Sequence, residues 1–232
     1  MTGKRILSID IGGSGVKAII LDERGKPLTE RARVKTPAPA TPGAVLKAVD
    51  SVVKTQGPFD RVSVGFPGVI RKGVVYTAYN LSPRWVGFNL AQALTKRLRK
   101  PARVANDADI QGMAAVRGRG VELAITLGTG MGSALFVDGK LVPNLELGHH
   151  PFHKGKEYEE LIGDAGRKRI GRARWNALLE RAIAELEHLF NYDTLYIGGG
   201  NTKYIDLKLP GNVRIVPNVL GLLGGIALWK DE

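Results

Sequence analysis

The sequence contains no cysteine among its 232 residues. This absence excludes disulfide bonds and metal sites built from thiolates, and it makes a reducing compartment the simpler setting for the protein. No apolar run approaches the ~18 residues of a membrane-spanning helix. No charged and then apolar leader precedes the first apolar segment, which begins at Ile6. We therefore expect a cytoplasmic protein with no membrane partner.

Aromatic side chains are also scarce, at 6% of the chain, and acidic residues are outnumbered by basic ones. The 34 lysines and arginines against 22 aspartates and glutamates give a formal net charge of +12. Such an excess favours a polyanionic partner such as polyphosphate or nucleic acid, with general solubility as the alternative explanation. The few aromatic residues and the lack of a helix-turn-helix pattern argue against nucleic acid. We expect no nucleic-acid partner.

The remaining composition is that of a globular protein, with 44% hydrophobic and 24% charged residues. The length fits one large domain or two of about 100 residues each. Short apolar runs alternate with segments whose apolar residues recur at helical spacing, a pattern typical of α/β proteins. The predicted strands are residues 6–9, 16–21, 60–64, 102–105, 194–197 and 213–216, and the predicted helices are residues 44–54, 91–99, 110–116 and 175–190. Alternating basic residues at 29–35 indicate an exposed edge strand.

The first two predicted strands flank the glycine turn DIGGSGVK, residues 10–17. Apolar runs on either side of such a turn predict a β-hairpin. Its glycines let the backbone approach a ligand closely and direct N–H groups toward a phosphate. Asp10, at the mouth of the turn, is placed to hold a hydrated divalent metal ion between phosphate oxygens. The alternative is an ordinary hairpin with a solvated aspartate, because glycine-rich turns are common.

A second copy of this pattern follows 116 residues later, where residues 127–140 can be laid over residues 11–26. The matching pairs are Gly12 with Gly128, Ala18 with Ala134, Asp22 with Asp138 and, after a two-residue deletion, Gly25-Lys26 with Gly139-Lys140. We interpret the match as an internal duplication. Two facing glycine turns can grip a chain of phosphates from both sides.

Polar residues follow several other predicted strands. Asp107 comes directly after one strand and before a helix, so it is either a helix N-cap or a catalytic carboxylate. Glu146 and His149 lie three residues apart in a loop flanked by glycine and proline, where they can converge on sugar hydroxyls or bind a metal ion. With no cysteine and no further histidine pair at zinc spacing, we expect no zinc.

Six motifs, taken together and in order, resemble the ROK family of sugar kinases, which has the actin-like ATPase fold, and within it the polyphosphate glucokinases. They are DIGGS with Lys17 (residues 10–17), GFPG (65–68), NDAD (106–109), LGTGMGS (127–133), ELGH (146–149) and GGG (198–200). The resemblance implies two α/β domains of the actin-like, ribonuclease H-like type, with a duplicated β-hairpin phosphate loop and an interdomain cleft. We expect these domains at residues 1–106 and 107–232, with the last helix, about residues 218–230, able to pack back on the N-terminal domain.

The resemblance also implies an activity: transfer of a phosphoryl group from inorganic polyphosphate, with ATP as a further candidate donor, to the 6-hydroxyl of glucose. Mg²⁺ is the implied cofactor, and we expect a homodimer. Two alternatives are an ATP-only hexokinase that acts on glucose, mannose or fructose, and a non-catalytic sugar sensor. A sensor needs neither Asp107 nor the two glycine turns, and their presence argues against it.

Each motif residue takes a role from the family pattern. Asp107 is implied as the general base. The implied sugar contacts are Asn80, Asn106, Glu146, His149 and one of Glu157, Glu159 and Glu160, of which we take Glu159. The implied phosphate contacts are Asp10, Gly12, Gly13, Ser14, Lys17, Gly128, Thr129 and Gly130, with Asp10 near Mg²⁺ and Gly198, Gly199 and Gly200 near a nucleotide. The chain departs from many members in lacking their cysteine-rich zinc motif, and from the repressor members in lacking an N-terminal DNA-binding domain.

Overall fold

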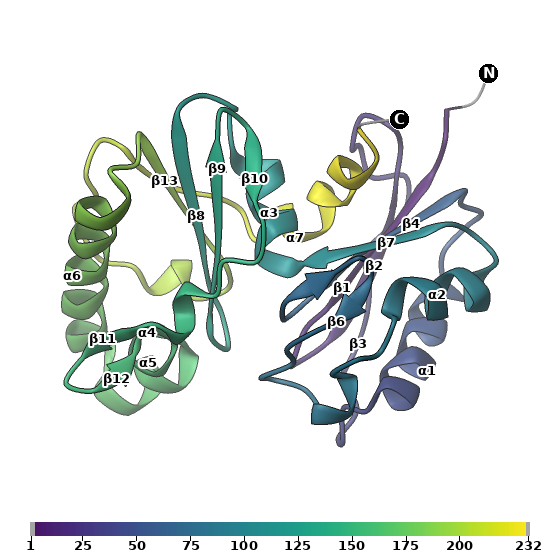
Figure 1. The fold of residues 1–232 in the computed structure, drawn as a ribbon, viewed down its shortest axis with the longest axis horizontal. Coiled ribbons are helices and arrows are strands. Elements are labelled where there is room, and N and C mark those ends of the chain that lie inside the picture. Colours follow the sequence, from purple (N-terminus) through teal and green to yellow (C-terminus); the bar gives the residue numbers. More distant parts are fainter. Residues whose placement is uncertain (1–2, 231–232) are drawn as a thin grey trace. The chain divides into compact units, whose positions relative to one another are not determined.

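The computed structural model describes residues 3–230, which fold as two units (Figure 1). The first unit comprises the chain up to residue 110 together with the segment from residue 221 onward, and the second comprises residues 111–220. Each unit is built around one five-stranded sheet. The C-terminal segment thus belongs to the same unit as the N-terminal sheet.

The sheet of the first unit has the strand order β3-β2-β1-β4-β7. β1, β2 and β3 are antiparallel neighbours, whereas β4 and β7 run parallel to β1. The strands are β1 (Ile6–Ile11), β2 (Val16–Leu21), β3 (Ala32–Val34), β4 (Arg61–Phe66) and β7 (Ala102–Asn106). Alternate residues such as Leu7 and Ile9 are fully buried in one apolar cluster with the helix α1 (Pro42–Val53), because successive side chains of a strand point to opposite faces.

The opposite face of this sheet is packed against the C-terminal segment, which forms α7 (Leu220–Leu223) and the 3-10 helix η4 (Gly224–Trp229). The buried hydroxyls of Ser8 and Ser63 donate to the carbonyl oxygens of Leu222 and Gly225, both at 2.6 Å. A Cβ atom on Gly225 would lie 2.4 Å from Ser8 Oγ. The glycine at this position therefore permits the close backbone approach on which both hydrogen bonds depend.

Further short elements complete the first unit around its sheet. Trp85 is fully buried there, packs on Phe66 and donates through Nε1 to the Ala40 carbonyl oxygen. These elements are β5 (Ile70–Arg71), β6 (Val74–Val75), the 3-10 helix η1 (Pro83–Trp85) and α2 (Leu90–Leu98).

The sheet of the second unit has the order β10-β9-β8-β13-β14. Its strands are β8 (Val121–Leu127), β9 (Met131–Val137), β10 (Lys140–Val142), β13 (Thr194–Gly198) and β14 (Val213–Ile215). The long helix α6 (Arg172–Phe190) packs on one face through residues such as Leu179 and Ile183. On the other face, α3 (Asp107–Ala115) approaches Phe136 so closely that a Cβ on Gly112 would lie 2.6 Å from that ring.

Short elements complete the second unit between β10 and α6 and after β13. They are the 3-10 helix η2 (Leu147–His149), β11 (Pro151–His153), β12 (Lys156–Glu157), α4 (Tyr158–Ile162), α5 (Asp164–Ile170) and the 3-10 helix η3 (Thr202–Tyr204). Buried Trp175 of α6 donates through Nε1 to the Ile162 carbonyl oxygen, which fixes α4 against the long helix.

The two sheets share one topology, with an antiparallel β-meander followed by two parallel strands. The predicted α/β fold with a duplicated hairpin is therefore confirmed. One detail of the predicted alignment is wrong. Ala18 pairs with Ile9, whereas Ala134 pairs with Ala124, one place away from the corresponding Ile125. The reason is the turn length: four residues separate β1 from β2, but only three separate β8 from β9.

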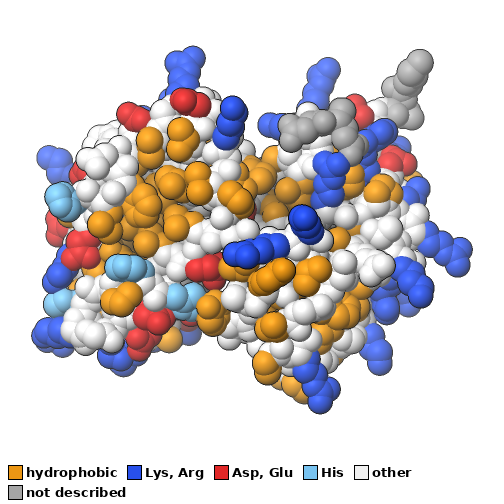
Figure 2. All heavy atoms as spheres, in the orientation of Figure 1, with side chains coloured by type: hydrophobic (Ala, Val, Ile, Leu, Met, Phe, Trp, Pro, Cys, Tyr) orange, Lys and Arg blue, Asp and Glu red, His pale blue; other side chains and the backbone are white. Residues whose placement is uncertain are grey.

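Within residues 3–230, no helix is both long and apolar enough to cross a membrane. Lysine and arginine side chains are spread over the visible face, with acidic side chains between them (Figure 2). The net positive charge is thus not confined to one patch of this face.

Candidate functional site

The first glycine turn joins β1 to β2. The Gly12 N–H donates to the Gly15 carbonyl oxygen at 3.0 Å, which closes the turn. The Thr36 hydroxyl donates to the Gly12 carbonyl oxygen at 2.5 Å and fixes the turn from the side of β3. Gly13 and Ser14, at the tip, are exposed. The turn is therefore held at its base and open at its tip, as a loop that receives a ligand should be.

Asp10 and Lys17 form an ion pair at the base of this turn. They face each other across β1 and β2, and Lys17 Nζ lies 2.7 Å from Asp10 Oδ2. Both side chains are largely buried, with exposed fractions of 17% for Asp10 and 24% for Lys17. The pair places a carboxylate and an ammonium group side by side, which suits a site that handles both a cation and a phosphate.

Asp107 lies close to the register partner of Asp10 on the neighbouring strand. Gly65 is the register partner of Asp10 on the neighbouring strand β4. A Cβ on Gly65 would lie 3.4 Å from the Cα of Asp107. Since residues in register on parallel strands point to the same face, Asp10 and Asp107 lie on the same face of the sheet. Two carboxylates predicted to serve phosphoryl transfer are thus brought together within one unit.

Asn106 is the main cap of the helix α3, and Asp107 Oδ1 also accepts from the Ala108 N–H, at 2.9 Å. Asn106 Oδ1 accepts from the N–H groups of Ala108 at 2.7 Å and Asp109 at 3.2 Å. Its Nδ2 donates to the Gly68 carbonyl oxygen at 3.2 Å and so ties the helix start to the GFPG turn. Of the two roles that the sequence left open for Asp107, that of principal helix cap belongs to its neighbour Asn106.

Asn80 lies beside the first glycine turn. A Cβ on Gly13 would lie 3.5 Å from the Asn80 carbonyl oxygen.

The second glycine turn joins β8 to β9 in the other unit. The Gly128 N–H donates to the Gly130 carbonyl oxygen at 3.0 Å. The Gly128 carbonyl oxygen accepts from Asn201 Nδ2 at 3.0 Å and from the Asp164 N–H at 2.9 Å. Thr129, at the tip, is exposed. Like the first turn, this one is fixed behind its tip.

The GGG turn, residues 198–200, lies directly behind the second glycine turn. A Cβ on Gly199 would lie 2.3 Å from the Leu127 carbonyl oxygen, and Gly199 has a φ of +92°. Both facts require glycine at this position, since other residues rarely adopt this φ. The Asn201 N–H donates to the same Leu127 oxygen at 2.9 Å. The glycine motif therefore serves the packing of two loops, and leaves Gly200 exposed.

Four predicted sugar-site candidates gather in the second unit around His149. Its Nδ1 lies 2.9 Å from Glu157 Oε2, and its Nε2 lies 4.0 Å from Glu146 Oε2. Glu159 reaches the glycine turn, since a Cβ on Gly130 would lie 1.8 Å from Glu159 Oε2. The three neighbouring glutamates thus differ in their contacts. The third, Glu160, forms an ion pair with Lys156 at 3.0 Å.

The pKa of the Glu146 carboxyl group is perturbed within this cluster. Burial raises the pKa of the Glu146 carboxyl group, the nearby His149 lowers it, and the negative charge of Glu159 raises it further. The net pKa lies above the ordinary value of 4.5. Perturbed carboxylates of this kind are more frequent at functional sites than elsewhere. Placing Glu146 and Glu159 near each other is unfavourable for the folded chain alone, but provides two acceptors for hydroxyl groups.

The hairpin of β11 and β12 follows His149 in the second unit. An aromatic stack supports it: the rings of Phe152 and Tyr158 lie 4.2 Å apart with an interplanar angle of 14°. The Arg181 guanidinium lies over Phe152, with 5.8 Å between its carbon and the ring centre. Among residues 3–230, no group of three or more potential ligands gathers to hold a metal ion. Aromatic packing occupies this place in the fold.

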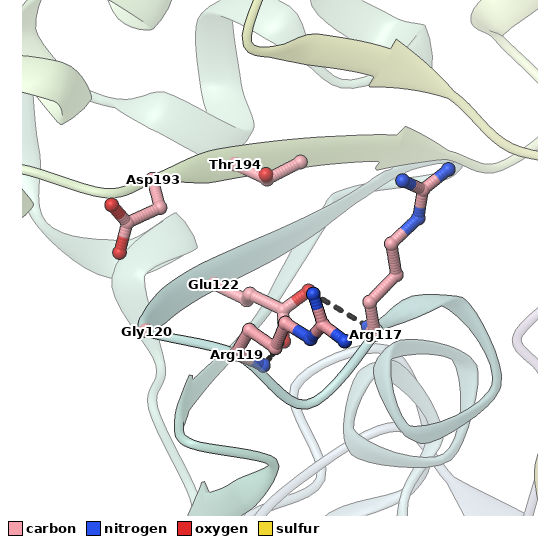
Figure 3. Close-up of a pocket in the computed structure, with 6 residues that line it drawn as sticks. All are labelled: Arg117, Arg119, Gly120, Glu122, Asp193 and Thr194. Atoms are coloured by element: carbon pink, nitrogen blue, oxygen red, sulfur yellow. Dashed lines mark hydrogen bonds between the residues drawn. The ribbon is translucent and has the colours of Figure 1, made fainter.

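A pocket of about 590 Å³ lies in the second unit where β8 and β13 begin, whereas the glycine turn follows the other end of β8 (Figure 3). None of the predicted site residues lines it. Its buried Glu122 accepts hydrogen bonds from the N–H groups of residues 117–119 and from the Tyr196 hydroxyl. Burial raises the pKa of Glu122, but these hydrogen bonds outweigh burial and hold the pKa below its ordinary value. Glu122 therefore anchors the basic loop that precedes β8.

Comparison with known proteins decides the family. The model described as "ROK family" matches residues 6–168, which is more than half of the chain. The chain belongs to the ROK family. A polyphosphate glucokinase of Mycobacterium tuberculosis (strain CDC 1551 / Oshkosh) is 33% identical over 238 residues, covering 97% of this chain and 89% of the relative.

Solved structures of ROK proteins agree with this assignment. The inorganic polyphosphate/ATP-glucomannokinase from Arthrobacter sp. strain KM is 39% identical, has a TM-score of 0.89, and the match covers 97% of this chain and 99% of that one. A ROK family glucokinase from Streptomyces griseus, in complex with glucose and AMPPNP, has a TM-score of 0.81 at 19% identity, with 98% and 100% covered. The second likeness shows the fold alone: the actin-like fold of the ROK sugar kinases.

Three residues that shape these sites were missed by sequence reasoning. Thr36 and Asn201 fix the two glycine turns through single hydrogen bonds. Arg33 lies over the first turn, with its Nε 2.8 Å from the Cβ position of Gly15. No spacing rule links Thr36 to Gly12 or Asn201 to Gly128. For Arg33, the predicted edge strand was the one available signal.

Proposed function

We propose that this protein is a glucokinase that transfers a phosphoryl group from inorganic polyphosphate to the 6-hydroxyl of glucose. The observation that carries the proposal is the place of Asp107, at the start of α3, above Gly65 and on the face of the sheet that Asp10 shares. The similarity to polyphosphate glucokinases at 33% identity supports the choice of donor and acceptor. The protein is thus an alcohol-directed phosphotransferase of the ROK family.

In this reaction Asp107 accepts the proton of the 6-hydroxyl as its oxygen attacks phosphorus. A positioned general base contributes roughly 10²–10⁴-fold to such a rate. Asn106 keeps Asp107 in place, because its side chain fixes the first turn of α3. Phosphoryl transfer otherwise needs positioning and charge neutralisation more than covalent chemistry. The exposed tip of the first glycine turn and Lys17 are the groups of the first unit that supply these.

Asp10 fits the role of a Mg²⁺ neighbour. One of its oxygens pairs with Lys17, and among the described residues it is part of no group of three or more potential metal ligands. Mg²⁺ commonly keeps several waters and binds through one or two carboxylates together with substrate phosphates. The ion, when bound, would neutralise charge on the donor phosphate. A Mg²⁺ ion bound in this way needs a single carboxylate of the protein, that of Asp10.

Glucose recognition falls to the cluster around His149. We assign Glu146, His149 and Glu159 to the sugar hydroxyls, because Glu159 approaches both Glu146 and the Gly130 turn. Glu157 holds the His149 ring through Nδ1. That contact leaves the other ring nitrogen directed to the side of Glu146. Asn80, beside Gly13, stays a candidate sugar contact on the family pattern alone.

The donor assignment is tested by one assay. Purified protein is incubated with glucose, Mg²⁺ and either polyphosphate or ATP, and glucose 6-phosphate is measured. We expect product from polyphosphate, with a steep loss of rate at high salt because the donor is a polyanion. Product from ATP alone would overturn the donor assignment and leave the kinase assignment standing. Glucose binding without any product would establish the sugar sensor in its place.

A further inference from the structure

The edge strand β3 and the residues on either side of it expose basic side chains. Ala32 and Val34 pack against the core of the first unit, whereas Arg31, Arg33 and Lys35 are exposed. Charged residues on an edge strand commonly serve to prevent pairing with another sheet. That general role applies equally to all three. It does not account for what distinguishes Arg33 from the other two.

Register places Arg33 at the end of a row of charged residues. Asp10 of β1 faces Lys17 of β2, and Lys17 faces Arg33 of β3. Lys17 is paired with Asp10 at 2.7 Å. The Arg33 guanidinium forms no hydrogen bond or ion pair within the part of the chain that the structure describes, residues 3–230. Arg33 is therefore the cation of this row whose charge is not offset by a carboxylate.

Arg33 is also directed to the glycine turn. A Cβ on Gly15 would lie 2.8 Å from Arg33 Nε and 3.2 Å from its Nη2. A larger residue at position 15 would require the guanidinium to move away from the turn. Because Gly15 has no side chain, the Arg33 guanidinium lies against the turn that we assign to the donor phosphates. Arg31 lies two residues earlier, before β3 begins, and Ala32 next to it already pairs with Ala18, farther from the turn than Lys17.

We propose that Arg33 binds the phosphoryl donor and contacts phosphate groups beyond the one that is transferred. The inference rests on the proposed function, and it adds the direction in which the bound donor chain extends from the reacting phosphoryl group. Gly65, Asp10, Lys17 and Arg33 occupy four adjacent strands, so the row spans about 14 Å at a spacing of ~4.8 Å per strand. The reacting phosphoryl group lies at the Asp10 end, and the remaining chain extends toward β3. Arginine suits this role because its planar guanidinium binds phosphate through two hydrogen bonds.

The test compares Arg33→Gln with Arg31→Gln, which removes the same charge from an exposed residue just before β3. Polyphosphate binding is measured by calorimetry without glucose, so that no phosphoryl transfer takes place, at several salt concentrations. Loss of a hydrogen bond to a charged group predicts a Kd for Arg33→Gln that rises roughly ten- to hundredfold. The slope of log K against log salt should fall by about one unit. For Arg31→Gln we expect a Kd within about twofold of the wild type, since a distant surface charge contributes little.

Equal losses in the two variants would show a non-specific basic surface and overturn the inference, as would an unchanged Kd for Arg33→Gln or no binding of polyphosphate by the wild type. Both residues are exposed, and circular dichroism checks that each variant is folded. The kinase assay separates the two proposals. A wild type that produces glucose 6-phosphate from polyphosphate, alongside an Arg33→Gln variant with unchanged Kd, contradicts the role of Arg33 and leaves the proposed function intact.

Discussion

Gly65 faces Asp107 across the end of the first sheet: a Cβ on Gly65 would lie 3.4 Å from the Asp107 Cα and 3.5 Å from its Cβ. The glycine thus defines how closely the start of α3 approaches β4. A methyl group at this distance is in ordinary contact. A branched side chain has no room without moving Asp107.

This relationship predicts a graded effect of two substitutions. We expect Gly65→Ala to fold normally and to retain most of its activity. Gly65→Val should displace Asp107 and lower kcat by about a hundredfold, because a shift of ~1 Å in a reacting group has that effect. Steady-state kinetics with saturating glucose and donor measures the difference. Equal kcat values for the two variants would show that the position of Asp107 does not depend on Gly65.

The second glycine turn offers a comparison on the sugar side. A Cβ on Gly130 would lie 1.8 Å from Glu159 Oε2, whereas a Cβ on Gly128 meets nothing within 4 Å. The Glu159 side chain is flexible, so Gly130→Ala should fold but move its carboxylate. We expect glucose affinity, measured by calorimetry, to fall about tenfold, the typical effect of losing a hydrogen bond from a charged group. Gly128→Ala is the matched variant for glucose binding, and equal Kd values in both would contradict the assignment of Glu159.

Replacing Glu146 should stabilise the folded protein at neutral pH but not at acidic pH. The raised pKa of Glu146 means that ionisation is disfavoured in the folded chain, so the cost is absent at pH values well below 4.5 and appears as pH rises through the folded pKa. Glu146→Gln should therefore be more stable than the wild type near pH 7, while losing glucose affinity. Urea unfolding at neutral and at acidic pH measures this. A stability difference that is the same at both pH values would contradict the explanation.

The contacts of Trp229 predict that the C-terminal segment stabilises the first unit. Trp229 Nε1 donates to Ser63 Oγ at 2.8 Å, and the guanidinium groups of Arg61 and Arg103 lie 4.6 and 4.3 Å from its ring centre. Trp229→Ala should reduce the free energy of unfolding by about 3 kcal/mol, in the range for a buried aromatic side chain. Trp229→Phe keeps part of the apolar contact and should lose less. Unchanged thermal unfolding in Trp229→Ala would exclude this role.

The sequence predicted those parts of the protein that repeat or that local chemistry determines. The two glycine turns were recognisable because each lies between apolar strands and because one is a copy of the other. The alignment of Ala18 with Ala134 failed, since the first turn has four residues and the second has three. Strand periodicity alone gives no information on that single-residue difference.

Roles decided by tertiary contacts could not be predicted. Asn106 and Asp107 are both competent helix caps, so the sequence alone does not identify the residue that performs the capping. Glu157, Glu159 and Glu160 lie within one helical turn, and the structure separates them by partner: His149, the Gly130 turn and Lys156. Strand register, which the sequence does not encode locally, brings Arg33 to Lys17.

The central claim is that Asp107 serves as the base in transfer of a phosphoryl group to glucose. Asp107→Asn tests it most directly, because the amide keeps the shape of the carboxyl group and cannot accept the proton. With polyphosphate and glucose, we predict that kcat falls by roughly 10²–10⁴-fold, while glucose binding and the melting temperature stay close to those of the wild type. A kcat within about threefold of the wild type, well outside that range, would contradict the claim.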